Sequence, residues 1–154
     1  MTKELKNLYI EQSPKTPQVD LNQFNGELIL SGRSIPENAS KIYEPIFDWV
    51  TDYIKMPRPN TNLRLNLEYF NTASSIWLVK VLRTLAQIND PDHVLIVHLY
   101  LMIEDYDDIE EFEDIKEIFG PISGLFHDKG PSMGIKLYGT DEKGKVIKEK
   151  LIFF

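Results

Sequence analysis

The sequence contains no cysteine among its 154 residues. This absence excludes a disulfide framework, a thiolate zinc site and a cysteine nucleophile. No apolar run approaches the ~18 residues of a membrane span. The longest, Val94–Ile103, is interrupted by His98 and has the length of a buried strand. The first residues lack the apolar core of a secretory signal, so we expect a cytoplasmic protein without membrane insertion.

The usual sequence patterns of nucleotide, metal and catalytic sites are also missing. There is no glycine-rich phosphate loop, and the three histidines lack metal-site spacing. We expect His98 to be a structural residue with hydrogen-bond partners. Ser31–Ile35 lacks the second glycine of a nucleophile elbow. The net charge of −7 disfavours nucleic acid. We therefore expect no catalytic residue, no cofactor and no nucleic-acid partner.

What the sequence does contain is alternating strand and helix patterns within a length typical of one domain. The Asn25-Gly26 pair favours a hairpin between two early strands. Ser34 and Glu37 have the spacing of a capping box, which predicts Ser34 as the N-cap of the first helix. We expect strands over 5–11, 18–21, 27–32, 62–70 and 93–103, and helices after 34, over 71–88 and over 106–119.

Asn62–Phe70 alternates, which predicts a strand with one buried and one partly solvated face, Tyr69 on the buried side and Phe70 on the other. Two successive strand–helix–strand crossovers are right-handed, so their helices share one face if the strand order does not reverse. The fold class predicted is α/β, a single mixed sheet with helices packed mainly on one face.

The last part of the chain differs in character. Ile135–Tyr138 and Val146–Phe154 flank a turn containing Gly144, which predicts a terminal β-hairpin, and Leu125–His127 is a short strand-like run before it. We expect residues 1–130 to form the α/β domain and 131–154 to extend the same domain. The apolar end of this hairpin is expected to pack on the sheet or in a homodimer.

Two polar segments are candidates for function. Glu104–Asp114 holds eight carboxylates in eleven residues without the calcium-loop pattern, and is open to interpretation as a solvated helix start, a partner surface or a metal site. Asn71–Ser75 offers Thr72, Ser74 and Ser75, more hydroxyls than one helix cap requires. A phosphoryl group there would meet free amides, and Phe70 beside it suits a switched interface.

The stretches Ser31–Ala39 and Leu67–Ser75 resemble the two signature motifs of the SiaC family of bacterial regulatory phosphoproteins. Thr16-Pro17, Tyr43–Ile46 with Trp49, and the acidic segment agree with this resemblance. The family is similar in outline to the sulfate-transporter/anti-sigma-antagonist (STAS) fold, a sheet with helices largely on one side.

The resemblance implies partner switching by a protein that is not itself an enzyme. The unmodified form would bind and activate a diguanylate cyclase, raising cyclic di-GMP. A dedicated Ser/Thr kinase would phosphorylate the threonine that matches Thr72, and a PP2C-type phosphatase would reverse this. The motif positions expected to contact partners are Arg33, Ser34, Glu37, Asn38, Glu68, Tyr69, Phe70, Asn71, Ser74 and Ser75.

Two other functions stay open at this point. A constitutive scaffold or subunit would use the same surface without phosphorylation. A small-molecule enzyme would use the acidic segment with a metal. The segment from about Met133 onwards extends beyond the family core, so the resemblance implies no role for it.

Overall fold

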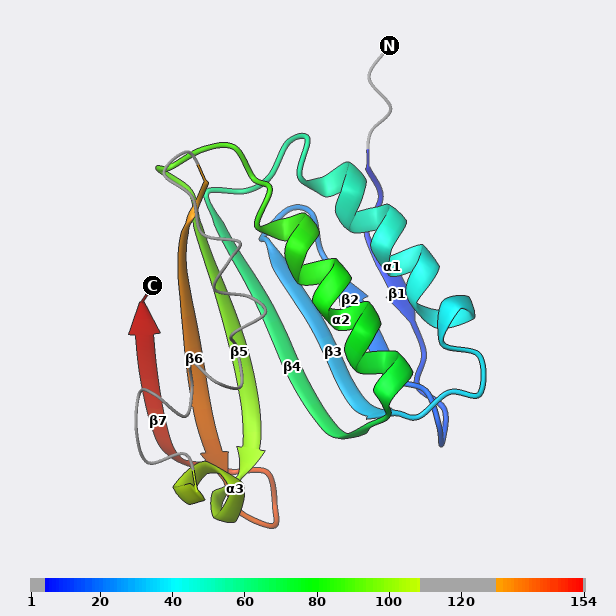
Figure 1. Cartoon of the computed structure of the whole chain (residues 1–154), viewed down its shortest axis with the longest axis vertical. Coiled ribbons are helices and arrows are strands. Elements are labelled where there is room, and N and C mark those ends of the chain that lie inside the picture. Colours follow the sequence, from blue (N-terminus) through cyan, green and yellow to red (C-terminus); the bar gives the residue numbers. More distant parts are fainter. Residues whose placement is uncertain (1–4, 109–129, 154) are drawn as a thin grey trace.

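The computed structural model describes residues 5–108 and 130–153. Its centre is a seven-stranded sheet in which the strands lie in chain order (Figure 1). The three central pairs, from β3 to β6, are parallel, whereas β1, β2 and β7 pair in the antiparallel sense. The strands are β1 (Leu8–Ile10), β2 (Gln18–Leu21), β3 (Glu27–Ser34), β4 (Asn60–Phe70), β5 (Val94–Met102), β6 (Ser132–Thr140) and β7 (Val146–Phe153).

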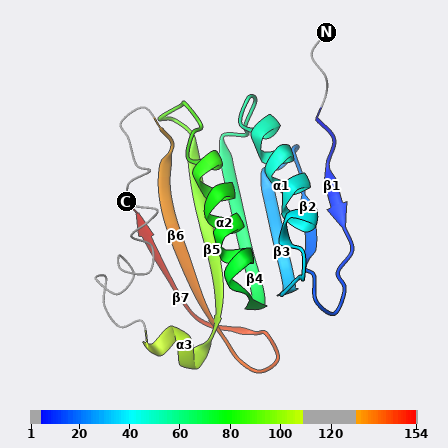
Figure 2. The ribbon, with the colours of Figure 1, turned by 45° about the vertical axis from the view of Figure 1, so that its right-hand side comes forward.

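Two long helices cover one face of this sheet. α1 (Ala39–Tyr53) connects β3 to β4, and α2 (Thr72–Leu85) connects β4 to β5. They lie side by side in front of the strands (Figure 2), since the strand order does not reverse between the crossovers. The short α3 (Ile103–Asp108) follows β5 directly. The predicted fold class and the terminal hairpin are therefore confirmed.

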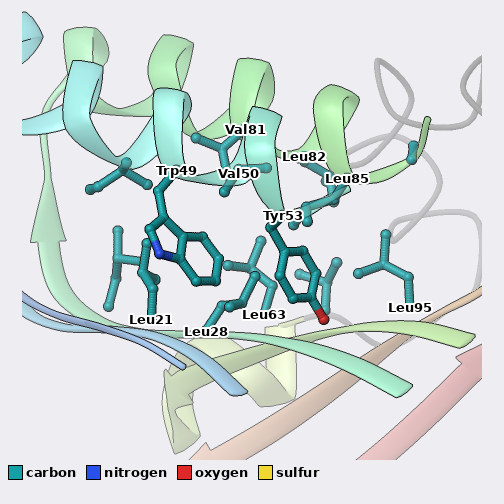
Figure 3. Packing of buried hydrophobic residues seen from close by; sticks show 14 of the residues in the cluster. Leu21, Leu28, Trp49, Val50, Tyr53, Leu63, Val81, Leu82, Leu85 and Leu95 are labelled. Carbon is teal, nitrogen blue, oxygen red and sulfur yellow. The ribbon is translucent and has the colours of Figure 1, made fainter. Parts of the chain in front are cut away.

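The hydrophobic core fills the layer between the two helices and the sheet. Figure 3 shows Trp49 and Tyr53 of α1 and Leu85 of α2 pointing toward the sheet residues. The rings of Trp49 and Tyr53 stack with centroids 5.1 Å apart. Leu28, Leu63 and other alternate strand residues meet them from below, because successive side chains of a strand point to opposite faces. Within the described ranges, no helix is long and apolar enough to cross a membrane.

The opposite face of the sheet carries a polar network. Arg64 donates to Glu27 across 2.8 Å and to the hydroxyl of Tyr100 across 3.0 Å. His98 is only 6% exposed. Its Nδ1 lies 2.7 Å from the Tyr138 hydroxyl and its Nε2 lies 2.8 Å from Asn62 Oδ1. The prediction that His98 is a partnered structural residue is confirmed.

The predicted capping box is wrong. α1 begins at Ala39 with Asn38 as its N-cap, and no side chain caps it. Ser34 instead ends β3 and is fully buried, while Glu37 pairs with Lys15 across 3.4 Å. A proline disfavours helical backbone at the residue before it, so Pro36 holds Ile35 out of the helix and delays the helix start.

The predicted alternation fails at the end of β4. Tyr69 is 59% and Phe70 58% exposed, although Tyr69 was expected to be buried. Pairing of β4 with β5 ends at Leu65, so the last five residues of β4 have only β3 as a neighbour. A bulge between Gly32 and Arg33 also shifts the register there.

The third helix is also placed differently. It begins at Ile103 rather than Tyr106. The rest of the predicted 106–119 helix, the carboxylates after Asp108 and the Leu125–His127 run lie outside the described residues.

Two glycines allow a test of the β2–β3 turn. Gly26 and Gly144 both have positive φ, +70° and +81°. An added Cβ at Gly26 would lie 2.3 Å from the Asn60 carbonyl oxygen, whereas at Gly144 it would meet nothing within 4 Å. We expect Gly144→Ala to cost about 1 kcal/mol of unfolding free energy. Gly26→Ala is expected to cost clearly more, because the start of β4 must also move. Urea unfolding measures both, and equal losses would contradict the close approach.

A second prediction concerns the stability of the protein at acidic pH. Burial, and next the charge of Arg64, lower the pKa of His98 to about 4. This value includes the smaller effects of Glu27, which raises the pKa, and of Lys136, which lowers it. In the unfolded chain the ring takes up a proton near pH 6.5, before the folded protein does, so stability falls as pH drops from about 6.5 to 4. We expect this group to remove up to about 3 kcal/mol. His98→Gln should lack that part of the loss. Parallel pH profiles of urea unfolding for the two proteins would contradict the assignment.

Candidate functional site

A buried chain of hydroxyl groups joins the carboxyl end of β3 to α1 and to the start of α2. Tyr43 of α1 lies 2.6 Å, oxygen to oxygen, from Ser34 at the end of β3. Ser34 lies 2.8 Å from the hydroxyl of Ser74 in the first turn of α2. All three residues are fully buried. We call Tyr43, Ser34 and Ser74 the hydroxyl chain.

Proton positions in the hydroxyl chain follow from its last bond. The Ser74 hydroxyl donates to the backbone carbonyl of Ser34 across 2.9 Å. Ser34 must therefore donate to Ser74, and Tyr43 must donate to Ser34, because each hydroxyl has one proton. Burial raises the pKa of Tyr43, which keeps its donor proton in place. Three elements far apart in the sequence are thus fixed to one another by satisfied buried groups.

Asn71 completes this junction as the N-cap of α2. Its Oδ1 accepts from the Ser74 amide across 2.9 Å, and its Nδ2 donates to the Pro36 carbonyl across 3.2 Å. Its own amide donates to the Ser34 carbonyl across 2.9 Å. Thr72 is the first residue of α2 and is exposed. The amides of Thr72 and Ala73 have no hydrogen-bond partner among the described residues.

Exposed large apolar side chains lie before and after Thr72 in the chain. Tyr69 and Phe70 precede it on β4, and each is more than half exposed. Ile76 follows it by one helical turn and is 54% exposed, and Ile35 is 36% exposed. Residues four apart on a helix are surface neighbours, so Thr72 and Ile76 lie on one stripe. We call these five residues the Thr72 surface.

Charged side chains flank the Thr72 surface. The guanidinium of Arg33 lies 5.5 Å from the centre of the Tyr69 ring and 3.6 Å from a carboxylate oxygen of Glu68. Glu37 and Asn38 lie in the exposed connection from β3 to α1. An apolar centre with a charged rim is typical of protein–protein interfaces.

The structure brings the predicted site residues to one end of the sheet but gives them different positions. Ser34 and Ser74 are fully buried, so they support the surface from beneath rather than form part of it. Ser75 is half-buried and donates to the Thr72 carbonyl across 2.7 Å.

Sequence reasoning missed Ile35 and Ile76. Ile76 carried a usable signal, because it lies off the apolar stripe of Leu78, Val81, Leu82 and Leu85 that faces the core. A large apolar residue on the outer side of an amphipathic helix is a candidate contact residue.

This arrangement suits reversible modification. An exposed hydroxyl at a helix start is accessible to a modifying enzyme, and a phosphate there meets unpaired amides and the positive end of the helix dipole. The hydroxyl chain lies beneath and contains no exposed group. A phosphate on Thr72 would change the charge of the surface without entering the core.

This α/β protein exposes a threonine directly after two exposed aromatic residues, which is a surface suited to contact with another protein. The model of the SiaC family regulatory phosphoproteins matches residues 10–124. The chain belongs to the SiaC family.

Proteins from Pseudomonas aeruginosa are similar to this chain in sequence or in fold. Protein PA14_02130 of strain UCBPP-PA14 is 28% identical over 83 residues, which cover 54% of this chain and 66% of that protein. The crystal structure of apo-SiaC superposes with a TM-score of 0.62 at 22% identity, covering 73% of this chain and 92% of that one. SiaC bound to the diguanylate cyclase SiaD, whose activator it is, gives a TM-score of 0.61 at 24% identity, covering 71% and 90%. These structures share the fold.

A substitution at the N-cap tests how the Thr72 surface is positioned. Asn71→Ala removes the acceptor of the Ser74 amide and should cost about 1 kcal/mol of unfolding free energy. Asn71→Asp keeps that acceptor and places a negative charge at the helix start, so it should cost less than half as much. Urea unfolding measures both variants. An Asn71→Asp protein as unstable as Asn71→Ala would show that the contact of Nδ2 with Pro36, not the cap, holds the junction.

Proposed function

We propose that this protein is a phosphorylation-controlled activator that binds a diguanylate cyclase through the Thr72 surface while Thr72 is unmodified. The observation that carries the proposal is the position of Thr72, exposed at the first position of α2 and directly after two exposed aromatic residues. Membership of the SiaC family supports a regulatory phosphoprotein. The cyclase as partner is supported by the complex of a structural relative with its cyclase.

In this proposal a dedicated Ser/Thr kinase modifies Thr72 and a PP2C-type phosphatase restores it. Phosphorylation adds about −1.5 to −2 charges and three acceptor oxygens. A partner packed on Phe70 and Ile76 would have to bury that charge, which costs several kcal/mol when no cation pairs with it. The fold should tolerate the same group, because the free amides at the helix start accommodate it.

The geometry also bears on which residues of the motif touch the partner. We propose that Arg33, Glu37, Asn38 and Glu68 form the rim and that Tyr69 and Phe70 provide the apolar contact. Asn71, Ser74 and Ser75 set the position of α2. Aromatic residues dominate the energy of many interfaces, whereas exposed ion pairs at a rim contribute little.

We further propose that residues 131–154 belong to the same folding unit as the rest. β6 pairs with β5 along its whole length, from Val94 with Ser132 to Met102 with Thr140. A homodimer that pairs two copies of the edge strand β7 about Glu149 is disfavoured by its charges. A two-fold axis at Glu149 would place Glu149 opposite its own copy and Lys148 opposite Lys150, and like charges directly opposite destabilise a sheet.

Titration calorimetry of the cyclase with unmodified and Thr72-phosphorylated protein tests the switch. We expect the phosphorylated form to bind at least about 100-fold more weakly. Thr72→Ala should bind normally and resist the kinase. Thr72→Asp should bind more weakly than the unmodified protein but more tightly than the phosphorylated one, because it has one charge and a shorter side chain.

Ser132→Asp is the matched control for charge. Ser132 is an exposed hydroxyl residue at the start of β6, at the other end of the sheet from Thr72. It should leave cyclase binding unchanged. Equal affinities of the unmodified and phosphorylated forms would refute the switch and favour a constitutive scaffold.

A further inference from the structure

A groove of about 610 Å³ runs between α1 and α2 on the side away from the sheet. Its floor is aromatic. Trp77 of α2 stacks on Tyr43 with ring centroids 6.3 Å apart, and Phe47 of α1 meets Trp77 edge-on at 6.3 Å. Trp77 and Phe47 form the floor, and both are half-buried, so they are partly accessible. The groove is open to solvent, and accessible aromatic side chains are enriched at protein–protein contacts.

The two walls of the groove carry opposite charges. Glu44 and Asp48 of α1 line one wall, and Lys80 and Arg83 of α2 line the other. All four are exposed, and none forms an ion pair with another charged group in the described part of the chain. The ammonium of Lys80 lies 4.6 Å from the centre of the Trp77 ring, over the floor. The charges are therefore available to a ligand.

The spacing of these charges matches a helix. Glu44 and Asp48 are four residues apart and Lys80 and Arg83 are three apart, so each wall presents two charges one helical turn apart. A third helix laid along two neighbouring helices packs its ridges into the groove between them. Its flanks would then face the two walls at the same spacing.

The groove continues the Thr72 surface. Thr72, Ile76, Lys80 and Arg83 follow one another at intervals of four, four and three along α2, which places them on one stripe of the helix. The floor is joined to the hydroxyl chain through Tyr43, which stacks on Trp77 and bonds to Ser34. The Thr72 surface and one wall of the groove therefore share a stripe of α2.

We propose that the α1–α2 groove is the docking site for an amphipathic helix of the partner protein. That helix has large apolar residues toward Trp77 and Phe47, a basic flank toward α1 and an acidic flank toward α2. The proposal rests on the proposed function for the identity of the partner, but the chemistry of the groove is testable without the cyclase.

The probes are three synthetic 16-residue helical peptides with the same leucine and phenylalanine face. The first has lysines on one flank and glutamates on the other, the second has glutamates on both flanks, and the third has lysines on both. Reversing the direction of a helix exchanges its flanks, so the uniform peptides meet one like-charged wall in either direction. Binding is followed by calorimetry and by the fluorescence of Trp77, since Trp49 is buried.

The wild-type protein should bind the mixed peptide about tenfold more tightly than either uniform peptide, as expected for a few partly exposed ion pairs. Glu44→Lys combined with Asp48→Lys makes both walls basic and should move the preference to the glutamate peptide. Lys80→Glu combined with Arg83→Glu should move it to the lysine peptide. Lys143→Glu combined with Lys145→Glu, in the β6–β7 turn, changes the net charge by the same amount as the Lys80 and Arg83 substitutions. This control should leave the peptide preference unchanged.

Two results would overturn the docking site: no binding of any peptide up to millimolar concentration, or equal affinities that the wall substitutions do not change. Either result leaves the effect of Thr72 phosphorylation on cyclase binding untouched. A lost phosphorylation effect with an intact peptide preference would contradict the proposed function alone.

Discussion

The organisation of the candidate site depends on the buried bond between Ser34 and Ser74. This bond joins the end of β3 to the first turn of α2 across forty residues of sequence. Neither hydroxyl can reach water, so each must be satisfied inside the protein, and the Tyr43 hydroxyl completes the set. Because the three hydroxyls bond to one another, they join β3, α1 and α2 at this junction. Thr72 therefore lies above a fixed base, which is the hydroxyl chain.

The base and the surface have different chemistry. Beneath Thr72 the three hydroxyl groups are buried and fully paired. Around it the side chains are large, apolar and exposed, as for Phe70 and Ile76. A fold gains nothing by exposing such residues, and grouped exposure marks interaction sites. In the proposed function, stability and recognition therefore belong to separate layers, and a phosphate would change the surface without disturbing the groups beneath it.

Much of the fold could be predicted from the sequence, because local patterns of apolar and polar residues determine its helices and strands. The alternation along β4 and the apolar stripes of α1 and α2 indicated their pairing faces, and the right-handed crossover rule placed both helices on one side. The Asn25-Gly26 turn and the terminal hairpin were equally local. The resemblance and the position after a strand predict Thr72 as the phosphorylated residue, and the structure places it at the start of α2.

The predictions that failed concern features that depend on contacts between distant segments. The spacing of Ser34 and Glu37 predicts a helix cap at Ser34. The neighbouring sequence does not show that the Ser34 hydroxyl bonds to Tyr43 and Ser74 instead. Exposure of Tyr69 depends on where β5 stops pairing, which the sequence of β4 does not contain. The groove between α1 and α2 likewise exists only once both helices lie on the same face.

The central claim is that phosphorylation at Thr72 changes the surface and leaves the base intact. Amide hydrogen exchange of the unmodified and phosphorylated protein, without a partner, tests it directly. We expect the amides from Ser74 to Leu85, and those of β3 and β4, to exchange at the same rates in both forms or more slowly after phosphorylation. Exchange 100-fold faster through the first two turns of α2 would contradict the claim. It would show that the phosphate acts by breaking the hydroxyl chain and unfolding the start of the helix.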